Sequence, residues 1–250
     1  GKFIPNDNGT APGIIFIDGE KLAILLPGPP RELIPMMDRQ VMPLLRKLVK
    51  GVIKSRYVKT MCIGESMLET KIPHFLESEN PTAALYAKGD GEVTIRITAK
   101  AETEQQADAM LDDMYAQLHS EISEYIYGVD VDNAETVIVD TLKKSMQTVA
   151  VAESCTGGKI ASRITSVAGA SQVFELGLCT YSNKQKVEVL DVNQDTIEEY
   201  TEVSSQVAAQ MAENVRRMAE SDYGVATTGY AGPGGKDVGL VYVAVASKEK

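Results

Sequence analysis

The sequence predicts an α/β protein in which a layered α/β domain follows a small α+β module. Two patterns lead to this expectation. From residue 128 to residue 250, helix-like and strand-like stretches alternate, which is typical of a sheet covered by helices. Within residues 51–127, the order is strand, helix, strand, strand, helix, which is typical of a compact α+β unit. Three parts are therefore expected, over residues 1–50, 51–127 and 128–250.

The composition excludes several classes of protein. The chain has 250 residues, of which 44% are apolar and 24% charged, as in ordinary globular proteins. A net charge of −10 argues against a general nucleic-acid binder or a protein of anionic membrane surfaces. The three cysteines have no metal-like spacing and fit a reduced, cytoplasmic setting. No signal peptide and no long apolar run is visible, so no membrane association is expected.

Residues 1–50 begin with the turn-rich stretch "PNDNGTAPG". The apolar runs "GIIFID" and "LAILLPG", separated by "DGE", predict a β-hairpin. Pro30 can occupy the first turn of a helix that continues through "RELIPMMDRQVMPLLRKLV". Pro35 and Pro43 predict that this helix is broken or kinked. Because the chain begins without Met and ends on "SKEK" directly after a strand, we expect a fragment of a longer protein.

The middle part contains the strand "YVKTMCI", the helix "ESMLETKIPHFLES" with an irregularity at Pro73, and the strands "TAALYAK" and "EVTIRITAK". A long amphipathic helix, "TEQQADAMLDDMYAQLHSEI", closes it. This order suggests a KH-like module. However, "IGESMLE" lacks the Gly-x-x-Gly loop that clamps a nucleic-acid backbone, so nucleic acid is not expected as a partner. His74 and His119 lie on helices without a surrounding cluster and are interpreted as structural.

The last part contains the strands "TVAVAES", "QVFELGLCTYS", "YGVATTG" and "VGLVYVAVAS". Helices are predicted at "DNAETVIVDTLKKSM", at "TGGKIASRITSV", at two short stretches after residue 183, and at "SSQVAAQMAENVRRMAES", with Ser204 as the cap of the last. This alternation is the basis for the layered sheet.

The strongest site signal is "VAESCTGGKIASRIT", residues 151–165, where a strand changes into a helix. Ser154 lies at the expected carboxyl end of the strand, where open α/β sheets bind ligands. Backbone N–H groups around Thr156, Gly157 and Gly158 could hold a phosphate or an oxyanion. Two alternatives stay open. Ser154 could serve only as a helix cap, and Cys155 is a rival nucleophile, although it has no histidine partner.

A second signal is "CTYSNKQK", residues 179–186. Tyr181 and Ser182 end a strand, Asn183 is a good cap, and Lys186 follows in the first helical turn. The positive helix end and burial both lower the pKa of a lysine, so Lys186 could act as a base. The alternative is an exposed surface lysine. Residues 128–250 contain no histidine, so a serine nucleophile there needs a lysine or tyrosine partner.

The glycine-rich stretch "TTGYAGPGGKD", residues 227–237, permits close approach of the backbone to a ligand. It is neither a Walker A loop nor a G-x-G-x-x-G motif, so it specifies no nucleotide class. A tight connection between two hairpin strands is an equally good interpretation.

Several motifs together carry a family resemblance: "NGTAPG", "LPGPPRE", "ESCTGG", "VAGAS", "TYSNKQK", "VSSQVAAQMA" and "TGYAGPGG". In this order they resemble the competence/damage-inducible protein A (CinA) family. The resemblance implies a nicotinamide mononucleotide deamidase domain over 128–250 and a KH-type module over 51–127. It also implies that residues 1–50 are the end of a molybdopterin-binding-like domain, linked in the family to ADP-ribose pyrophosphatase activity. Ala168 and Tyr230 stand where the family often has Pro and Ile.

The resemblance also implies a function. Ser154 would attack the carboxamide of nicotinamide mononucleotide, with Lys186 and Tyr181 handling the proton, to give nicotinate mononucleotide and ammonia in pyridine nucleotide salvage. The expected substrate-binding residues are Cys155, Thr156, Gly157, Gly158, Gly169, Ala170, Ser171, Asn183, Thr228, Gly229, Ala231, Gly232 and Gly234.

This hydrolysis would need no metal or other cofactor, whereas the pyrophosphatase of the full-length protein would use a divalent metal. The expected partners are the small pyridine nucleotide and a second copy of the chain in a homodimer. Two alternatives remain. One is pyrophosphatase activity through the N-terminal domain, which is truncated here, and the other is a non-catalytic nucleotide-binding module.

Overall fold

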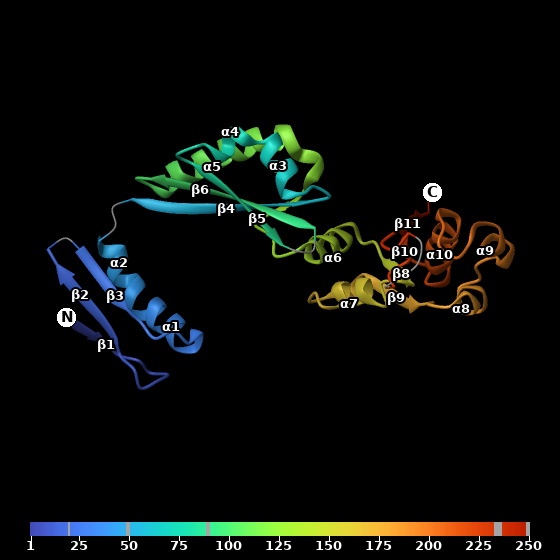
Figure 1. The fold of residues 1–250 in the computed structure, drawn as a ribbon, viewed down its shortest axis with the longest axis horizontal. Helices are drawn as coiled ribbons and strands as arrows, with labels where there is room; N and C mark the ends of the chain where they lie inside the picture. The colour runs from blue at the N-terminus through green and yellow to red at the C-terminus, as the bar shows by residue number, and fades with distance from the viewer. Residues whose placement is uncertain (20, 49–50, 89–90, 233–236, 249–250) are drawn as a thin grey trace. The chain divides into compact units, whose positions relative to one another are not determined.

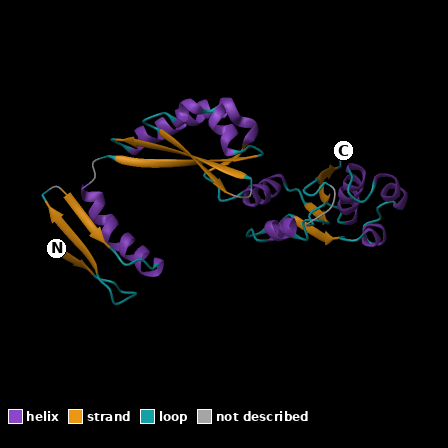
Figure 2. Cartoon of the chain, viewed as in Figure 1, coloured by secondary structure: helices purple, strands orange, loops and turns teal. Residues whose placement is uncertain are grey.

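The computed structural model describes residues 1–19, 21–48, 51–88, 91–232 and 237–248 (Figure 1). The chain divides into two compact units. One contains residues 1–56, 71–84 and 96–121, and the other contains residues 57–70, 85–95 and 122–250. Helices and strands both occur in each, so the predicted α/β class is confirmed (Figure 2).

The N-terminal residues form a three-stranded antiparallel sheet in the order β1-β2-β3. Its strands are β1 (Lys2–Ile4), β2 (Gly13–Asp18) and β3 (Lys21–Leu25). The predicted hairpin is present, because β2 pairs with β3 from Ile14↔Leu25 to Asp18↔Lys21. The strand β1, which the sequence pattern did not predict, lies directly before the turn-rich stretch "PNDNGTAPG".

A broken helix follows this sheet, as the prolines predicted. It consists of α1 (Pro30–Met36), a π-helical turn η1 (Met37–Val41) and α2 (Met42–Leu48). Pro43 has no N–H to donate to the carbonyl four residues earlier, and the wider turn ends at Val41, two residues before it. Ile4, Met36 and Val41 form a small buried cluster.

The middle residues form a four-stranded sheet in the order β5-β6-β4-β7. Its elements are β4 (Val52–Met61), α3 (Glu65–Lys71), α4 (Pro73–Leu76), β5 (Thr82–Lys88), β6 (Glu92–Ala101), α5 (Glu104–Ile122), the short 3-10 turn η2 (Ser123–Tyr125) and β7 (Ile126–Val129). The predicted helix over "ESMLETKIPHFLES" is split because Pro73 starts a new helix. The sequence analysis missed β7, an edge strand of four half-buried residues that is too short to show alternation.

The C-terminal residues form a four-stranded sheet in the order β11-β10-β8-β9. The strands β10 (Tyr223–Gly229), β8 (Val149–Glu153) and β9 (Phe174–Cys179) are parallel, and β11 (Val241–Ser247) is an antiparallel edge. The helical elements around them are α6 (Ala134–Ser145), α7 (Lys159–Thr165), the 3-10 turn η3 (Ala170–Gln172), α8 (Asn183–Glu188), α9 (Gln194–Tyr200) and α10 (Ser205–Met218).

Helices cover both faces of this sheet, which confirms the layered α/β arrangement. On one face, the small side chains of Ala150, Ala152 and Ala226 allow α10 to pack closely through Val207 and Met211. The other face carries a second buried cluster shared with α6 and α7: Val139, Leu142, Val149, Val151, Ile164, Ala170 and Val173. Every residue of β8 is buried, so this strand is the centre of the domain.

The helix starts in this domain have local causes. Ser204 caps α10 as predicted, because its hydroxyl accepts a hydrogen bond from the N–H of Val207 at 3.3 Å. Asn183 was expected to cap α8, but Ser182 does so and accepts from the N–H of Gln185 at 3.3 Å. Serine and asparagine both suit this position, and the chain turns one residue earlier. Across the residues described, no helix combines the length and the apolar character that crossing a bilayer requires.

Candidate active site

Ser154 follows the last residue of β8, at the carboxyl end of the parallel strands. Its N–H donates to the carbonyl of Thr227 on β10 at 3.0 Å, and its side chain is buried. The chain then turns through Gly157 and Gly158, whose φ angles are +61° and +93°. These values favour glycine, and a Cβ at either position would meet no atom within 4 Å. The residue that caps α7 is Gly158, so the Ser154 hydroxyl is not used as a helix cap.

Lys186 on α8 is only 1% exposed, so the interpretation as a surface lysine is wrong. Its Nζ lies 3.1 Å from the Ser154 Oγ. It also lies 3.1 Å from the carbonyl oxygen of Thr180 and 3.2 Å from that of Tyr181. The two sequence stretches singled out for chemistry, around residues 154 and 186, therefore meet in the fold.

The three contacts of Nζ satisfy both protonation states of Lys186. A charged ammonium has three N–H donors, one for each contact. A neutral amine has two N–H donors and one lone pair. Because carbonyl oxygens only accept, the two donors go to Thr180 and Tyr181, and the lone pair faces the Ser154 hydroxyl. A proton can therefore pass from Oγ to Nζ with every polar group still hydrogen-bonded.

Burial lowers the pKa of Lys186 below its ordinary value, because desolvation penalises the ammonium form. The charge of Glu202, and smaller electrostatic contributions from Cys155 and Cys179, oppose this effect but do not outweigh it. Within the described part of the chain, no carboxylate lies within ion-pair distance of Nζ. Lys186 therefore has the environment of a general base.

Cys155, the rival nucleophile, has a different environment. Burial raises the pKa of its thiol, although its own N–H, the N–H of Thr156 and the charge of Lys186 act in the opposite direction. A raised pKa leaves less of the reactive thiolate at neutral pH. The raised pKa of the Cys155 thiol and the contact between Lys186 and the Ser154 hydroxyl therefore favour Ser154 over Cys155 as the nucleophile.

The N–H groups expected to hold an oxyanion are partly engaged already. The N–H of Gly157 donates to the Ser154 carbonyl at 3.1 Å, and the N–H of Gly158 donates to a carboxylate oxygen of Glu153 at 3.0 Å. The N–H groups of Cys155 and Thr156 both face the Cys155 sulfur, where they favour negative charge. Among the described groups of the turn, these two are the better candidates for an oxyanion site.

Glu153 is a site residue that the sequence analysis missed. It is 1% exposed, and its carboxylate accepts from the N–H groups of Gly158, Ile160 and Ala161 at 2.9–3.1 Å. Burial alone would raise the pKa of this carboxyl. The Thr156 hydroxyl and the three N–H donors outweigh burial and hold the pKa below its ordinary range. The available signal was an acidic residue that ends a wholly apolar strand directly before a helix with a glycine cap.

Tyr181 takes part through its backbone. Its carbonyl accepts from Lys186, while its side chain is 73% exposed. Its phenol has no hydrogen-bond partner among the residues that the structure describes. The expected relay of a proton through this phenol is not arranged here and stays a prediction.

The glycine-rich stretch connects β10 and β11 as a hairpin, since the N–H of Tyr230 donates to the Leu240 carbonyl at 2.9 Å. Thr228 is buried, and its hydroxyl donates to the Glu202 carbonyl at 2.7 Å. Gly229 ends β10, and Ala231 and Gly232 follow it at the start of the connection. Gly234, also expected to bind substrate, lies outside the described residues.

The structure does not bring the "AGAS" stretch to Ser154. Gly169, Ala170 and Ser171 precede β9, and the N–H of Val149 at the start of β8 donates to the Val173 carbonyl. Because β8 and β9 are parallel, this stretch lies at the amino ends of the strands and Ser154 at the carboxyl ends. Ala170 itself is part of the buried core. These three residues were expected at the substrate because of their motif. The motif does not show at which end of the strands they lie.

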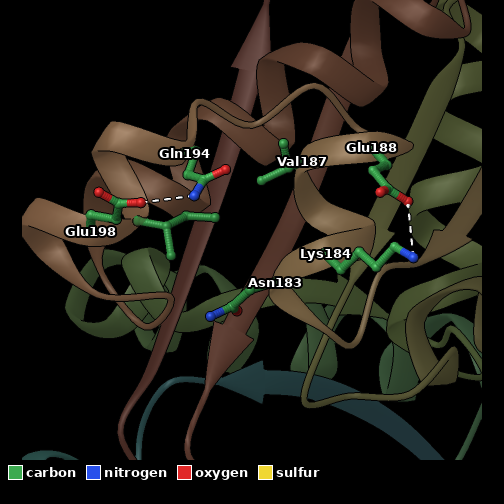
Figure 3. Close-up of a pocket in the computed structure, with 7 residues that line it drawn as sticks. Asn183, Lys184, Val187, Glu188, Gln194 and Glu198 are labelled. Atoms are coloured by element: carbon green, nitrogen blue, oxygen red, sulfur yellow. Dashed lines mark hydrogen bonds and ion pairs between the residues drawn. The ribbon is translucent and has the colours of Figure 1, made fainter.

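Asn183 lies in a separate pocket between α8 and α9, with a volume of about 400 Å³ (Figure 3). Its lining residues are Asn183, Lys184, Val187, Glu188, Gln194, Ile197 and Glu198. Two polar contacts lie along the pocket: Lys184 forms an ion pair with Glu188 at 3.8 Å, and the Gln194 amide donates to Glu198 at 2.8 Å. Neither Ser154 nor Lys186 lines this pocket. In the described ranges, no three His, Cys, Asp or Glu side chains gather as metal ligands.

Comparison with known proteins gives the family. Residues 131–250 match the family model of the CinA C-terminal domain, and residues 55–128 match that of the damage-inducible protein CinA KH domain. A solved competence/damage inducible protein, CihA from Agrobacterium tumefaciens, is 39% identical. The match covers 46% of this chain and 72% of that one, with a TM-score of 0.45. The chain belongs to the CinA family. The resemblance stated from the sequence motifs is thereby confirmed.

Two curated CinA relatives match over nearly the whole chain. A protein of Thermoanaerobacter pseudethanolicus, named as competence-damage inducible, is 47% identical over 253 residues, which is all of this chain and 61% of the relative. A CinA-like protein of Dictyoglomus thermophilum is 44% identical over 97% of this chain and 60% of its own length. The chain therefore spans about 60% of the length of these relatives.

Proposed function

We propose that this CinA-family chain hydrolyses the carboxamide of nicotinamide mononucleotide to nicotinate mononucleotide and ammonia. The observation that carries the proposal is the contact of 3.1 Å between the buried Lys186 Nζ and the Ser154 Oγ. A serine paired with a lysine of lowered pKa is an established arrangement for acyl transfer. The identity of the nucleotide comes from the family resemblance of the motifs around these two residues.

In the first half of the reaction, neutral Lys186 takes the hydroxyl proton while the Ser154 Oγ forms a bond to the carboxamide carbon. The N–H groups of Cys155 and Thr156 donate to the oxygen that becomes negative. When the tetrahedral intermediate collapses, the C–N bond breaks and Lys186 returns the proton to the leaving nitrogen. Ammonia departs, and an ester joins Ser154 to the nicotinoyl group.

In the second half, water attacks the ester carbon and gives its proton to Lys186. The C–O bond to Ser154 breaks, and Ser154 recovers a proton from Lys186. The net reaction consumes one water and releases one ammonia and one carboxylate product. The same two residues serve both halves, because Nζ returns to its neutral form after each.

The test is ammonia release from nicotinamide mononucleotide by the chain and by three variants, Ser154→Ala, Cys155→Ala and Lys186→Ala. We expect activity in the unsubstituted chain and in Cys155→Ala, and its loss in the other two. Lys184→Ala is the matched control, because Lys184 lies on the same helix and is exposed. Full activity of Ser154→Ala would contradict the mechanism, and loss in Cys155→Ala alone would move the nucleophile to the thiol.

A further inference from the structure

The side chains of Glu153 and Ser154 lie on opposite faces of the turn. Along an extended strand, successive side chains alternate between the two faces of the sheet. Val151 packs in the buried cluster with Ile164 of α7, whereas Ala152 packs in the cluster with α10. By the same alternation, Glu153 lies on the α7 side and Ser154 on the other. The Glu153 carboxylate is therefore adjacent to the nucleophile in sequence, but it lies on the opposite face of the sheet from the Ser154 hydroxyl.

The carboxylate takes the place of the missing cap of α7. The first N–H groups of a helix have no partner within it, and a side chain at the cap position usually accepts from them. The cap residue here is Gly158, which has no side chain to do so. One Glu153 oxygen accepts from Gly158 at 3.0 Å and Ile160 at 3.1 Å, and the other accepts from Ala161 at 2.9 Å.

Two hydroxyls extend this contact to the neighbouring strand. The Thr156 hydroxyl lowers the pKa of the Glu153 carboxyl, and it lies 2.7 Å from the hydroxyl of Thr227 on β10. Either hydroxyl can be the donor in this contact, because each carries one O–H and two lone pairs. The carbonyl of Thr227 also accepts a hydrogen bond from the N–H of Ser154. The turn is therefore held to the start of α7 through Glu153 and to β10 through Thr227.

We propose that Glu153 is a positioning residue for the nucleophile. By engaging the N–H groups at the start of α7, its carboxylate fixes residues 154–158. This holds the Ser154 Oγ against Lys186 and leaves the N–H groups of Cys155 and Thr156 for the carbonyl oxygen of the substrate. Glu153 itself does not touch the reacting atoms. The inference rests on the proposed function for the identity of the substrate, but the reactivity of Ser154 tests it separately.

The experiment compares the full chain with Glu153→Gln and Glu153→Asp. The first variant keeps the shape but turns an amide NH₂ toward N–H donors, and the second keeps the charge on a shorter side chain. Glu135→Gln is the matched control. This variant also removes a partly buried carboxylate, which in the unsubstituted chain pairs with Arg163 at 2.9 Å. Two rates are measured across pH: ammonia release, and labelling of Ser154 by phenylmethanesulfonyl fluoride, followed by intact mass.

For Glu153→Gln we expect both kcat and the plateau rate of labelling to fall about 100-fold, the effect of a misplacement of about 1 Å. KM stays within about twofold, because ground-state binding is not the function assigned to Glu153. The pH midpoint of labelling also stays unchanged, since the groups that act on the pKa of Lys186 are Glu202, Cys155 and Cys179. Glu153→Asp recovers part of the rate, and Glu135→Gln keeps it.

Three results would overturn the inference: labelling of folded Glu153→Gln at the unsubstituted rate, a loss that only follows the folded fraction, or a pH midpoint shifted to that of an exposed lysine. If Glu153→Gln does not fold, Glu153→Asp decides by the same criteria. Absence of labelling in the unsubstituted chain also contradicts the inference. Labelling at Ser154 without ammonia release refutes the proposed substrate alone and leaves the role of Glu153 to be judged by the labelling rates.

Discussion

Removing both members of the Ser154–Lys186 pair should cost no more activity than removing one. Lys186 Nζ contacts the nucleophile and two carbonyls, so among the described side chains it is Ser154 that can exchange a proton with it. Loss of a general base costs about 10²- to 10⁴-fold in rate, or about 3–5 kcal/mol. For Ser154→Ala, Lys186→Met and the double variant, we expect three similar losses of kcat, because residues that act as one unit are not additive.

The assay is steady-state ammonia release, with thermal unfolding measured for each variant. Lys186→Met removes the Nζ donor from the buried carbonyl of Thr180, which costs about 1–3 kcal/mol, and from the partly buried carbonyl of Tyr181, which costs less. Loss of the desolvation cost of the lysine offsets part of this, so rates are compared per folded molecule. A double variant whose loss equals the product of the two single losses would refute the reasoning, because it would mean that the two residues act independently.

Three further predictions concern the same domain. Glu202→Gln should move the pH–rate profile to lower pH, because the Glu202 charge raises the pKa of Lys186 and the neutral lysine is the active form; an unmoved midpoint contradicts this. Gly158→Ala should lower the free energy of unfolding by about 1–2 kcal/mol in urea titrations, since its φ of +93° disfavours a Cβ, and unchanged stability would argue against this turn. Ser204→Ala should cost about 1 kcal/mol through loss of the α10 cap, whereas Ser205→Ala, one residue further on, should cost little.

Most of the elements, and a pairing of Ser154 with Lys186, could be predicted from the sequence. Ser154 ends a strand of apolar residues and precedes two glycines, and this pattern predicts a strand, a turn and a helix with little ambiguity. Lys186 follows the next strand in the chain, and parallel neighbours place their carboxyl ends at one edge of the sheet. The sequence predicted this pair from the absence of histidine in residues 128–250 and from the family resemblance, and the strand direction in the structure explains why the two residues meet.

Other features depend on packing that a linear pattern does not contain. The Tyr181 ring is exposed, and it is the carbonyl of this residue that accepts a hydrogen bond from Lys186. Both facts depend on how α8 packs, whereas a motif gives only the residue type. The role of Glu153 depends on which backbone N–H groups lack partners, which requires the conformation of Gly158. Gly169 was misplaced because a short motif carries no information about which end of the sheet it occupies.

The most direct measurement is the titration of Lys186 itself. Lysines labelled with ¹³C at Cε are followed by NMR across pH, and Lys186→Met identifies the resonance. The structure predicts that the pKa of Lys186 lies below the ordinary value of 10.5, and the midpoint of its titration should match that of Ser154 labelling. A Lys186 resonance that titrates with the ordinary value, or at a pH unrelated to the reactivity of Ser154, would contradict a shared proton between the two side chains.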